Sequence, residues 1–251
     1  MSSNNARTAE QFVKKLETYR SLEELKKHRR YFKFDLENQD PDDYFIGVRM
    51  GQIFELAKEY IEMPVAEIEK LMESPVHEVR VGALSIMGKS AAAKKTSAER
   101  LKALYDLYIR RHDRINNWGL VDLAAHHVVG RYLADKSRDI LYKLARSKNT
   151  WERRTAIVAT AHFIRQRDLD DTFKIAALLL DDREDLIHKA TGWMLRAAGS
   201  ADRDRLLEFL DKHAAAMPRA ALRAAIEHLD KDQREHYLNL KKKGSAVQTA
   251  K

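Results

Sequence analysis

Helical periodicity with very few helix-breaking residues is the feature that most limits what this chain can fold into. Apolar residues recur at steps of three and four, as in Ile53, Leu56, Ala57 and Tyr60, and such steps place side chains on one face of an α-helix. Only 9 Gly and 4 Pro interrupt the 251 residues. We find no bounded, alternating run of Val, Ile and Thr of the kind that predicts a strand. The sequence therefore predicts an all-α fold.

A repeated pattern along the chain indicates that the helices are paired. Five segments align so that one residue of each falls at the same position, and these residues are Arg80, Asp122, Arg154, Lys189 and Arg223. They are 32 to 42 positions apart, which is the length of a helix pair and is typical of α-solenoids. We therefore predict a single curved α-solenoid of HEAT-like repeats over residues 1–240, followed by a flexible basic tail at residues 241–251.

The aligned position carries mostly basic side chains. In a solenoid it would form a row along the concave surface, and the basic residues of that row could follow a phosphate backbone. They are Arg80, Arg154, Lys189 and Arg223. The formal net charge of +8 also favours an anionic partner. Asp122 is the acidic exception, for which two interpretations are open: an ion pair with a neighbouring arginine, or a functional carboxylate.

Two tryptophans share helix faces with residues of this row. Trp118 lies four positions before Asp122, and Trp193 lies four positions after Lys189, so each pair is on one side of its helix. Tryptophan at helical spacing is most often part of the core, and Trp151 is predicted to be of that kind. A cluster of Trp118, Trp193 and Asp122 in a basic groove instead indicates a site for a cationic group, because indole faces attract cations and a carboxylate stabilises positive charge.

Several other chemistries have no support in the sequence. The absence of Cys excludes thiolate nucleophiles and zinc–thiolate sites. Gly47 and Gly51 lack the Lys and Ser or Thr that complete a phosphate-binding loop, and the adjacent His126 and His127 are expected on different helix faces, so we predict neither nucleotide hydrolysis nor a metal site. No secretory signal is recognised, and no apolar run approaches the ~20 residues of a membrane-spanning helix. We expect a cytoplasmic protein without membrane contact.

Three segments resemble the AlkD branch of the DNA alkylation repair proteins. They are INNWGLVDLAAHHVVG from Ile115, WERRTAIVATAHFIR from Trp151 and DLIHKATGWMLRAAG from Asp185, and the resemblance extends over roughly residues 45 to 240. It implies a HEAT-like solenoid whose concave face binds double-stranded DNA. The implied activity is that of a monofunctional DNA glycosylase in base excision repair, which removes N3- and N7-alkylated purines by hydrolysis of the N-glycosidic bond. Such an enzyme needs no metal or other cofactor. It is expected to act as a monomer that is associated with the nucleoid when bound to DNA.

The resemblance also assigns roles to residues. It places the two groove tryptophans at Trp118 and Trp193, the catalytic carboxylate at Asp122, and the phosphate-contacting arginine at Arg154, with Arg153 as the alternative. The remaining basic residues of the aligned row are expected to contact DNA as well, and these are Arg80, Lys189 and Arg223.

One position departs from the family pattern. Relatives usually carry Asp directly after the first groove tryptophan, where this chain has Gly119. A glycine in a helix interior is less favourable than alanine by about 1 kcal/mol, so we expect a weakened helix start there, with Asp122 itself retained.

Two alternative functions belong to different classes. The first is a noncatalytic HEAT-repeat protein that binds damaged or branched DNA, which the retention of Trp118, Asp122 and Trp193 disfavours. The second is a HEAT scaffold that binds other proteins. Salt-sensitive binding to duplex DNA would separate this scaffold from both DNA-binding functions.

Overall fold

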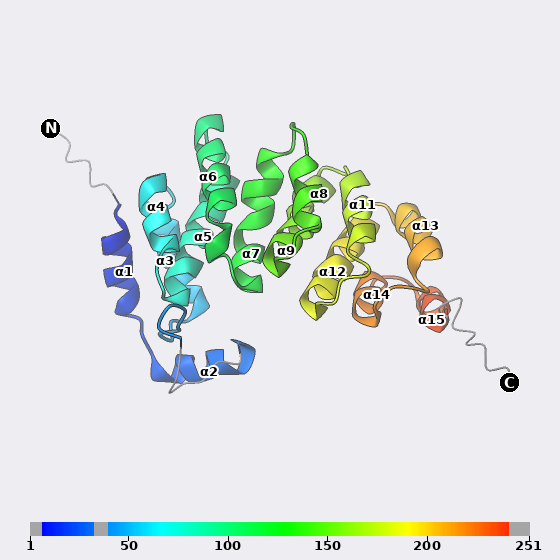
Figure 1. Ribbon diagram of the computed structural model, residues 1–251, viewed down its shortest axis with the longest axis horizontal. Coiled ribbons are helices and arrows are strands. Elements are labelled where there is room, and N and C mark those ends of the chain that lie inside the picture. Colours follow the sequence, from blue (N-terminus) through cyan, green and yellow to red (C-terminus); the bar gives the residue numbers. More distant parts are fainter. Residues whose placement is uncertain (1–6, 33–39, 241–251) are drawn as a thin grey trace. The chain divides into compact units, whose positions relative to one another are not determined.

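The computed structural model describes residues 7–32 and 40–240, and its helices are shown in Figure 1. Every regular element in those ranges is helical, with only two isolated β-bridges, Asp40–Asp43 and Tyr44–Val76, beside them. The prediction of an all-α fold is therefore confirmed. The basic tail predicted at residues 241–251 lies outside the described residues. Among the helices that are described, none has both the length and the apolar character needed to span a membrane.

The chain divides into two compact units, of which the first ends at Leu133. Its helices are α1 (Ala9–Glu17), α2 (Leu22–Phe32), α3 (Met50–Glu59), α4 (Val65–Met72), α5 (His77–Ala92), α6 (Ala98–Arg110), the 3₁₀ turn η1 (His112–Arg114), α7 (Trp118–Ala125) and the π-helical turn η2 (His126–Gly130). Helices α3, α5 and α7 pack side by side in one row, and α1, α4 and α6 form a second row against it. Helix α2 runs crosswise to these rows (Figure 1).

Helix α5 is the centre of the first unit. It packs against α3 and α7 within its own row and against α4 and α6 of the other row, so almost all of its side chains are buried. Its glycines permit this close approach, because a Cβ at Gly82 would collide with the ring of Phe12 and a Cβ at Gly88 would collide with the carbonyl oxygen of Leu123. Gly82 therefore lets α5 approach α1 of the other row, and Gly88 lets it approach α7 of its own row, as repeat stacking requires.

The second unit begins at Ala134 and has the same two-row construction. Its helices are α8 (Asp139–Ala145), α9 (Thr150–Ala159), α10 (Ala161–Arg165), α11 (Asp170–Leu178), α12 (Asp185–Ala201), α13 (Arg203–His213), α14 (Arg219–Ala225) and α15 (Lys231–Asn239). Helix α12 packs between α9 and α14, while α8 and α11 lie against this row from one side. Gly192 allows the contact between α12 and α14, since a Cβ there would lie 2.7 Å from the Cβ of Ala224.

The aligned sequence position selects one helix from each successive pair. Arg80 and Asp122 lie on α5 and α7, in one row of the first unit, and Arg154, Lys189 and Arg223 lie on α9, α12 and α14, in one row of the second unit. The spacing of 32 to 42 residues therefore corresponds to a helix pair, as predicted. The expected single array over residues 1–240 stays a prediction.

Candidate functional site

A pocket of about 580 Å³ opens on the first unit and contains two of the predicted site residues. Its walls come from α2, the residue before α3, and helices α3, α5 and α7. The lining residues are Glu24, Lys27, His28, Tyr31, Phe32, Arg49, Met50, Phe54, His77, Val81, Trp118, Gly119, Asp122 and Leu123. The pocket therefore combines aromatic and aliphatic walls with a small number of charged groups, which is the usual composition of a binding site for an organic ligand.

Helix α7 places Trp118 and Asp122 in the same wall. The helix begins at Trp118, and Asn117 caps it by accepting a hydrogen bond from the backbone N–H of Gly119 at 2.8 Å. Asp122 follows one helical turn later on the same face, as the spacing predicts. Trp118 is 37% exposed and Asp122 is half-buried. An indole and a carboxylate thus line one pocket, whereas a core tryptophan would have no such opening.

The helix start at Gly119 is more secure than its sequence indicates. The Asn117 side chain satisfies the Gly119 N–H, and N-cap residues of this type typically stabilise a helix by ~1 kcal/mol. A Cβ at Gly119 would meet only the Asn117 side chain, at 3.4 Å. The cap therefore offsets the expected weakness of a glycine in the first turn.

The aromatic wall around the indole of Trp118 includes Phe32 of α2. The rings of Phe32 and Trp118 are stacked, with their centroids 6.0 Å apart and an interplanar angle of 19°. Phe32 also stacks on Phe45 at 5.0 Å and lies 5.3 Å from the ring of His77. These contacts join α2 to the pocket and support the indole from one side.

Charged side chains of α2 and of the loop that precedes α3 line the same pocket. The carboxylate of Glu24 accepts hydrogen bonds from Arg49 Nη2 and from Lys27 Nζ, each at 2.9 Å. These two hydrogen bonds lower the pKa of Glu24 to about 2, and the bond from Arg49 has the larger effect. Glu24 is therefore ionised at neutral pH, and its charge is balanced by the two cations that contact it.

A buried carboxylate beneath the pocket fixes the loop that leads into α3. Glu78 of α5 is fully buried and accepts hydrogen bonds from the backbone N–H groups of Ile46, Gly47 and Val48, the closest at 2.8 Å from Gly47. Its Oε1 also lies 3.4 Å from Nδ1 of His28. Burial would raise the pKa of Glu78, but the contact with His28 and the backbone hydrogen bonds outweigh it and hold that pKa below its ordinary value.

His77 lies beside this carboxylate and lines the pocket. Its side chain is almost fully buried and is packed 4.4 Å from the ring of Phe45. Burial, together with the positive charge of Arg80, lowers the pKa of His77 to about 4. The imidazole is therefore neutral at physiological pH.

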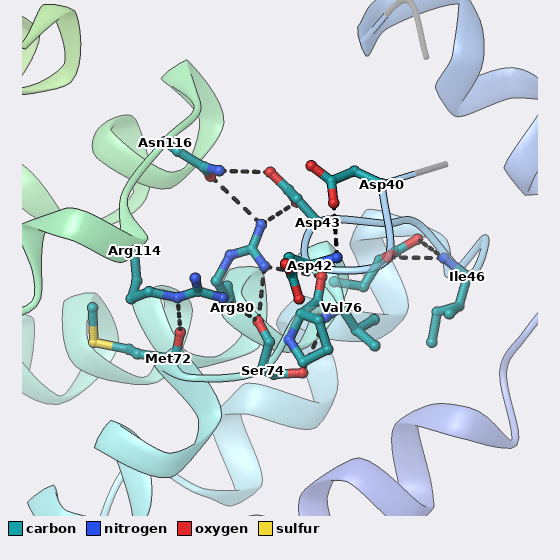
Figure 2. Close-up of polar contacts among 12 residues, drawn as sticks. Asp40, Asp42, Asp43, Ile46, Met72, Ser74, Val76, Arg80, Arg114 and Asn116 are labelled. Atoms are coloured by element: carbon teal, nitrogen blue, oxygen red, sulfur yellow. Dashed lines mark hydrogen bonds and ion pairs between the residues drawn. The ribbon is translucent and has the colours of Figure 1, made fainter. Parts of the chain in front are cut away.

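The predicted DNA contact at Arg80 conflicts with its position in the structure. Arg80 is 1% exposed, its Nη1 donates to the carbonyl oxygens of Ser74 and Pro75 at 2.8 and 3.1 Å, and its Nη2 pairs with the carboxylate of Asp43. Figure 2 shows the guanidinium enclosed by these partners and by Asn116. The prediction that Arg80 belongs to an exposed basic row is therefore wrong, because α5 is surrounded by helices and the loop around Asp43 covers the Arg80 side chain.

The two adjacent arginines of α9 are also engaged within the second unit. Arg154 is 5% exposed, and its Nη1 donates to the carbonyl oxygen of Leu186 at 2.6 Å. Arg153 donates through Nε to Asp182 at 2.5 Å. Arg153 thus connects α9 to the segment before α12, and Arg154 connects it to the first turn of α12. The structure differs here from an exposed row, and the phosphate-contacting role of either residue stays a prediction.

The remaining predicted residues of the second unit are accessible. Lys189 is exposed and pairs with Asp185 one turn earlier on α12, at 2.6 Å. Arg223 on α14 is exposed, and Trp193 on α12 is 38% exposed. Trp151, which was predicted to belong to the core, is only half-buried because it stands in the first turn of α9.

The adjacent histidines differ from expectation. His126 and His127 form the start of the π-helical turn η2, and their ring centroids are 3.8 Å apart. They therefore do not point to different faces, because the wider turn changes the angle between successive side chains. Over residues 7–32 and 40–240, no group of three or more His, Asp or Glu side chains is arranged to hold a metal ion.

The family model described as "DNA alkylation repair enzyme" matches residues 12–229 of the chain. No curated protein matches this chain. Among solved structures, the chain is similar to one titled "Predicted DNA alkylation repair enzyme from Enterococcus faecalis", with 20% sequence identity, a TM-score of 0.64, and coverage of 84% of this chain and 97% of that chain. This likeness supports the same all-helical fold. The match to most of the chain shows that it belongs to the DNA alkylation repair enzyme family, which implies a role in the repair of alkylated DNA, with DNA as its partner.

Proposed function

We propose that this protein is a monofunctional DNA glycosylase that removes cationic N3- and N7-alkylated purines from duplex DNA. The observation that carries the proposal is the placement of Trp118 and Asp122 in one wall of a partly aromatic pocket. Within a family that repairs alkylated DNA, an indole and a carboxylate on one helix face suit a lesion that carries positive charge. Hydrolysis of its N-glycosidic bond would begin base excision repair.

The chemistry needs few catalytic groups, because the alkylated base is already cationic. When the bond between C1′ and the base nitrogen breaks, its electron pair neutralises the departing base, and positive charge develops on the deoxyribose. The carboxylate of Asp122 would stabilise this charge and orient a water molecule toward C1′. The water oxygen then forms the new bond to C1′ and releases one proton to the solvent. The outline resembles carboxylate-assisted glycoside hydrolysis without the acid that usually protonates the leaving group.

The two half-exposed tryptophans would bind the cationic nucleotide through their ring faces. Trp118 contributes from the pocket wall, where Phe32 supports it. Trp193 is assigned to the same reaction by family resemblance, and its exposure of 38% on α12 leaves its indole accessible. We propose that no lysine nucleophile, metal or other cofactor takes part, so the strand itself is not cleaved.

The DNA-binding cations of this proposal differ in part from those of the aligned row. Lys189 and Arg223 are exposed and remain proposed phosphate contacts. Lys27 and Arg49 stand at the pocket that holds Asp122 and are further candidates that the alignment did not include. Arg80 is excluded from this set by its burial.

The decisive experiment measures base release from a duplex treated with a methylating agent. The purified protein is incubated with this duplex in the presence of a chelator, and free 7-methylguanine and 3-methyladenine are quantified against a protein-free control. The proposal expects release above the control for the parent protein and a large reduction for Asp122→Asn. Binding to the duplex without any release would instead support the noncatalytic damage-binding function.

A further inference from the structure

Asp43, Arg80 and Asn116 form a connected set of polar side chains, which we call the polar junction (Figure 2). Arg80 Nη2 pairs with one carboxylate oxygen of Asp43 and lies 3.5 Å from Oδ1 of Asn116. The other carboxylate oxygen of Asp43 accepts a hydrogen bond from Nδ2 of Asn116 at 2.5 Å. Each of the three side chains therefore contacts both of the others.

The polar junction joins three segments that are far apart in sequence. Asp43 belongs to a loop that is itself fastened to the start of α5, because His77 N donates to the carbonyl oxygen of Tyr44 at 2.8 Å and Tyr44 N donates to that of Pro75 at 3.0 Å. Arg80 holds the same turn through its two carbonyl contacts. Asn116 brings in the segment that precedes α7.

A second arginine fastens the segment before α7 from its other side. Arg114 donates through Nε to the carbonyl oxygen of Met72 at 3.3 Å and through Nη2 to that of Ser74 at 3.1 Å, and Figure 2 shows its side chain directed at this turn. Between the two anchors, Ile115 is fully buried. The approach to α7 is thus fixed at residues 114, 115 and 116.

The pocket residues follow this anchored segment directly. Asn117 is the N-cap of α7, Trp118 is the first residue of the helix, and Asp122 stands one turn further on. Trp118 is more than a third exposed, and a Cβ added at Gly119 would meet only the Asn117 side chain. Leu120 and Val121 fix the other face of this first turn in the core, so the polar contacts at Asn116 add a restraint on the exposed side, where Trp118 stands.

We propose that the polar junction positions Trp118 and Asp122, and that Arg80 is a positioning residue and not a DNA contact. Small displacements of reacting groups can slow an enzymatic reaction by up to ~100-fold, so a loosened helix start would reduce catalysis while duplex binding by cations elsewhere persists. The catalytic part of this inference rests on the proposed glycosylase function. The geometric part, that the junction fixes Trp118, does not.

The catalytic part is tested with Asp43→Asn, Asn116→Ala and Arg80→Lys. Lysine keeps the charge but carries its donors on a single nitrogen, so it cannot reproduce the fork in which Nη1 reaches two carbonyl groups and Nη2 reaches the carboxylate. We expect ~10-fold slower single-turnover release of 7-methylguanine at saturating protein, with affinity for undamaged duplex within about twofold of the parent. The double variant of Asp43 and Asn116 should be slowed by less than the product of the two single effects, because both substitutions act on the contact between these two side chains.

The matched control is Asp171→Asn. Asp171 pairs with Arg138 at 2.6 Å and both side chains are largely buried, but the pair lies in the second unit, outside the polar junction. This variant should release base at the parent rate. Variants of Asp43 and Asn116, whose side chains are partly exposed, carry the test if Arg80→Lys does not fold. Unchanged release in both, or weakened binding at an unchanged rate, would overturn the positioning role.

The geometric part is tested without any catalytic activity. In a background with Trp151→Phe and Trp193→Phe, Trp118 is the single tryptophan, and its fluorescence reports on its surroundings. Asp43→Asn and Asn116→Ala should increase quenching by acrylamide, whereas Asp171→Asn should leave it unchanged. Equal quenching in all variants would disprove the junction's hold on Trp118. If the parent releases no base while quenching responds as expected, the proposed function fails and the geometric inference stands.

Discussion

Two carboxylates, those of Glu24 and Asp122, line the same pocket. Glu24 is paired with Arg49 and Lys27, which lower its pKa to about 2, and its charge therefore serves to hold those cations. Asp122 shares a helix face with the half-exposed indole of Trp118. A cation that stacks on this indole would stand beside the Asp122 carboxylate, and we therefore propose that the charge of Asp122 matters for the reaction.

Replacing Asp122 by Asn is predicted to separate catalysis from binding. The substitution keeps the shape of the side chain but removes its charge, and loss of one preorganised electrostatic group commonly reduces a rate by ~10²- to 10³-fold. Duplex affinity should stay equal or rise slightly, because repulsion from phosphate is relieved. The measurement is single-turnover release of 7-methylguanine, with Glu24→Gln as the matched carboxylate control. A rate equal to the parent's would exclude Asp122 as the catalytic carboxylate.

Truncation of Trp118 is predicted to affect excision more than stability. Removing a fully buried indole usually costs ~3 to 5 kcal/mol, whereas Trp118 is 37% exposed, so Trp118→Ala should lower the free energy of unfolding by less than this range. Base release should fall strongly, and Trp193→Ala should behave in the same way. Trp151→Ala, which removes a half-buried indole from the first turn of α9, is the control and should retain release. Loss of folding in Trp118→Ala would assign the ring a structural role.

At the scale of helices, the sequence predicts position along the chain better than burial. The break at Asn116 and Asn117 and the shared face of Trp118 and Asp122 follow from local spacing and are present in α7. The burial of Arg80 could not be predicted in this way, because it depends on a loop 37 residues away that supplies Asp43. The contact between His126 and His127 was also missed, since a π-helical turn changes the periodicity on which the prediction rests.

The contribution of α2 to the pocket was likewise outside the sequence prediction. Phe32 reaches Trp118 only because α2 lies across the row of helices, and that arrangement depends on Glu78 and the loop at Gly47. A Glu within an apolar helix is the sequence signal that could have indicated this attachment of α2, because a buried carboxylate requires hydrogen-bond donors.

Gly47→Ala is predicted to disturb the attachment of α2. Gly47 has a φ of +78°, which L side chains rarely adopt, and an added Cβ would collide with the carbonyl oxygen of Ser21 and lie 2.8 Å from the backbone nitrogen of Leu25. We expect destabilisation by more than ~1 kcal/mol, measured by urea unfolding. Gly51→Ala is the control, because Gly51 lies in α3 with no atom within 4 Å of an added Cβ. That variant should be as stable as the parent or more so, and equal effects of the two substitutions would contradict the role of the loop.

For the folded molecule as a whole, His77 predicts a loss of stability in mild acid. Its pKa is lowered from 6.5 to about 4 by burial, so folding favours the neutral imidazole. Its contribution to stability is complete above pH 6.5 and is lost as the pH falls toward 4, with a total on the order of 3 kcal/mol. Glu78, whose pKa is lowered, adds a further loss as the pH falls below its unfolded value of about 4.3.

The pH effect is measured by urea unfolding at a series of pH values between 7 and 4. His77→Gln should flatten the dependence in the range from pH 6.5 to 4, because the titrating group is removed, whereas His236→Gln, which replaces an exposed histidine, should leave it intact. A parent protein whose stability does not change across this range would contradict the burial of His77 as the cause of the shift.

The net charge of the whole chain, +8, predicts that binding to duplex DNA weakens steeply with salt. Each phosphate neutralised by the protein contributes ~0.9 to the slope of log affinity against log salt concentration, because condensed counterions are released. Arg223→Gln, at an exposed position, should therefore make the slope shallower by about one. Arg100→Gln removes the same charge, but its guanidinium donates to the carbonyl oxygens of Ile61 and Met63, so its slope should match the parent's. Equal slopes for the two variants would exclude Arg223 as a phosphate contact. An affinity of the parent protein for duplex DNA that stays constant over an about fourfold range of salt concentration would favour a protein-binding scaffold over both DNA-binding functions.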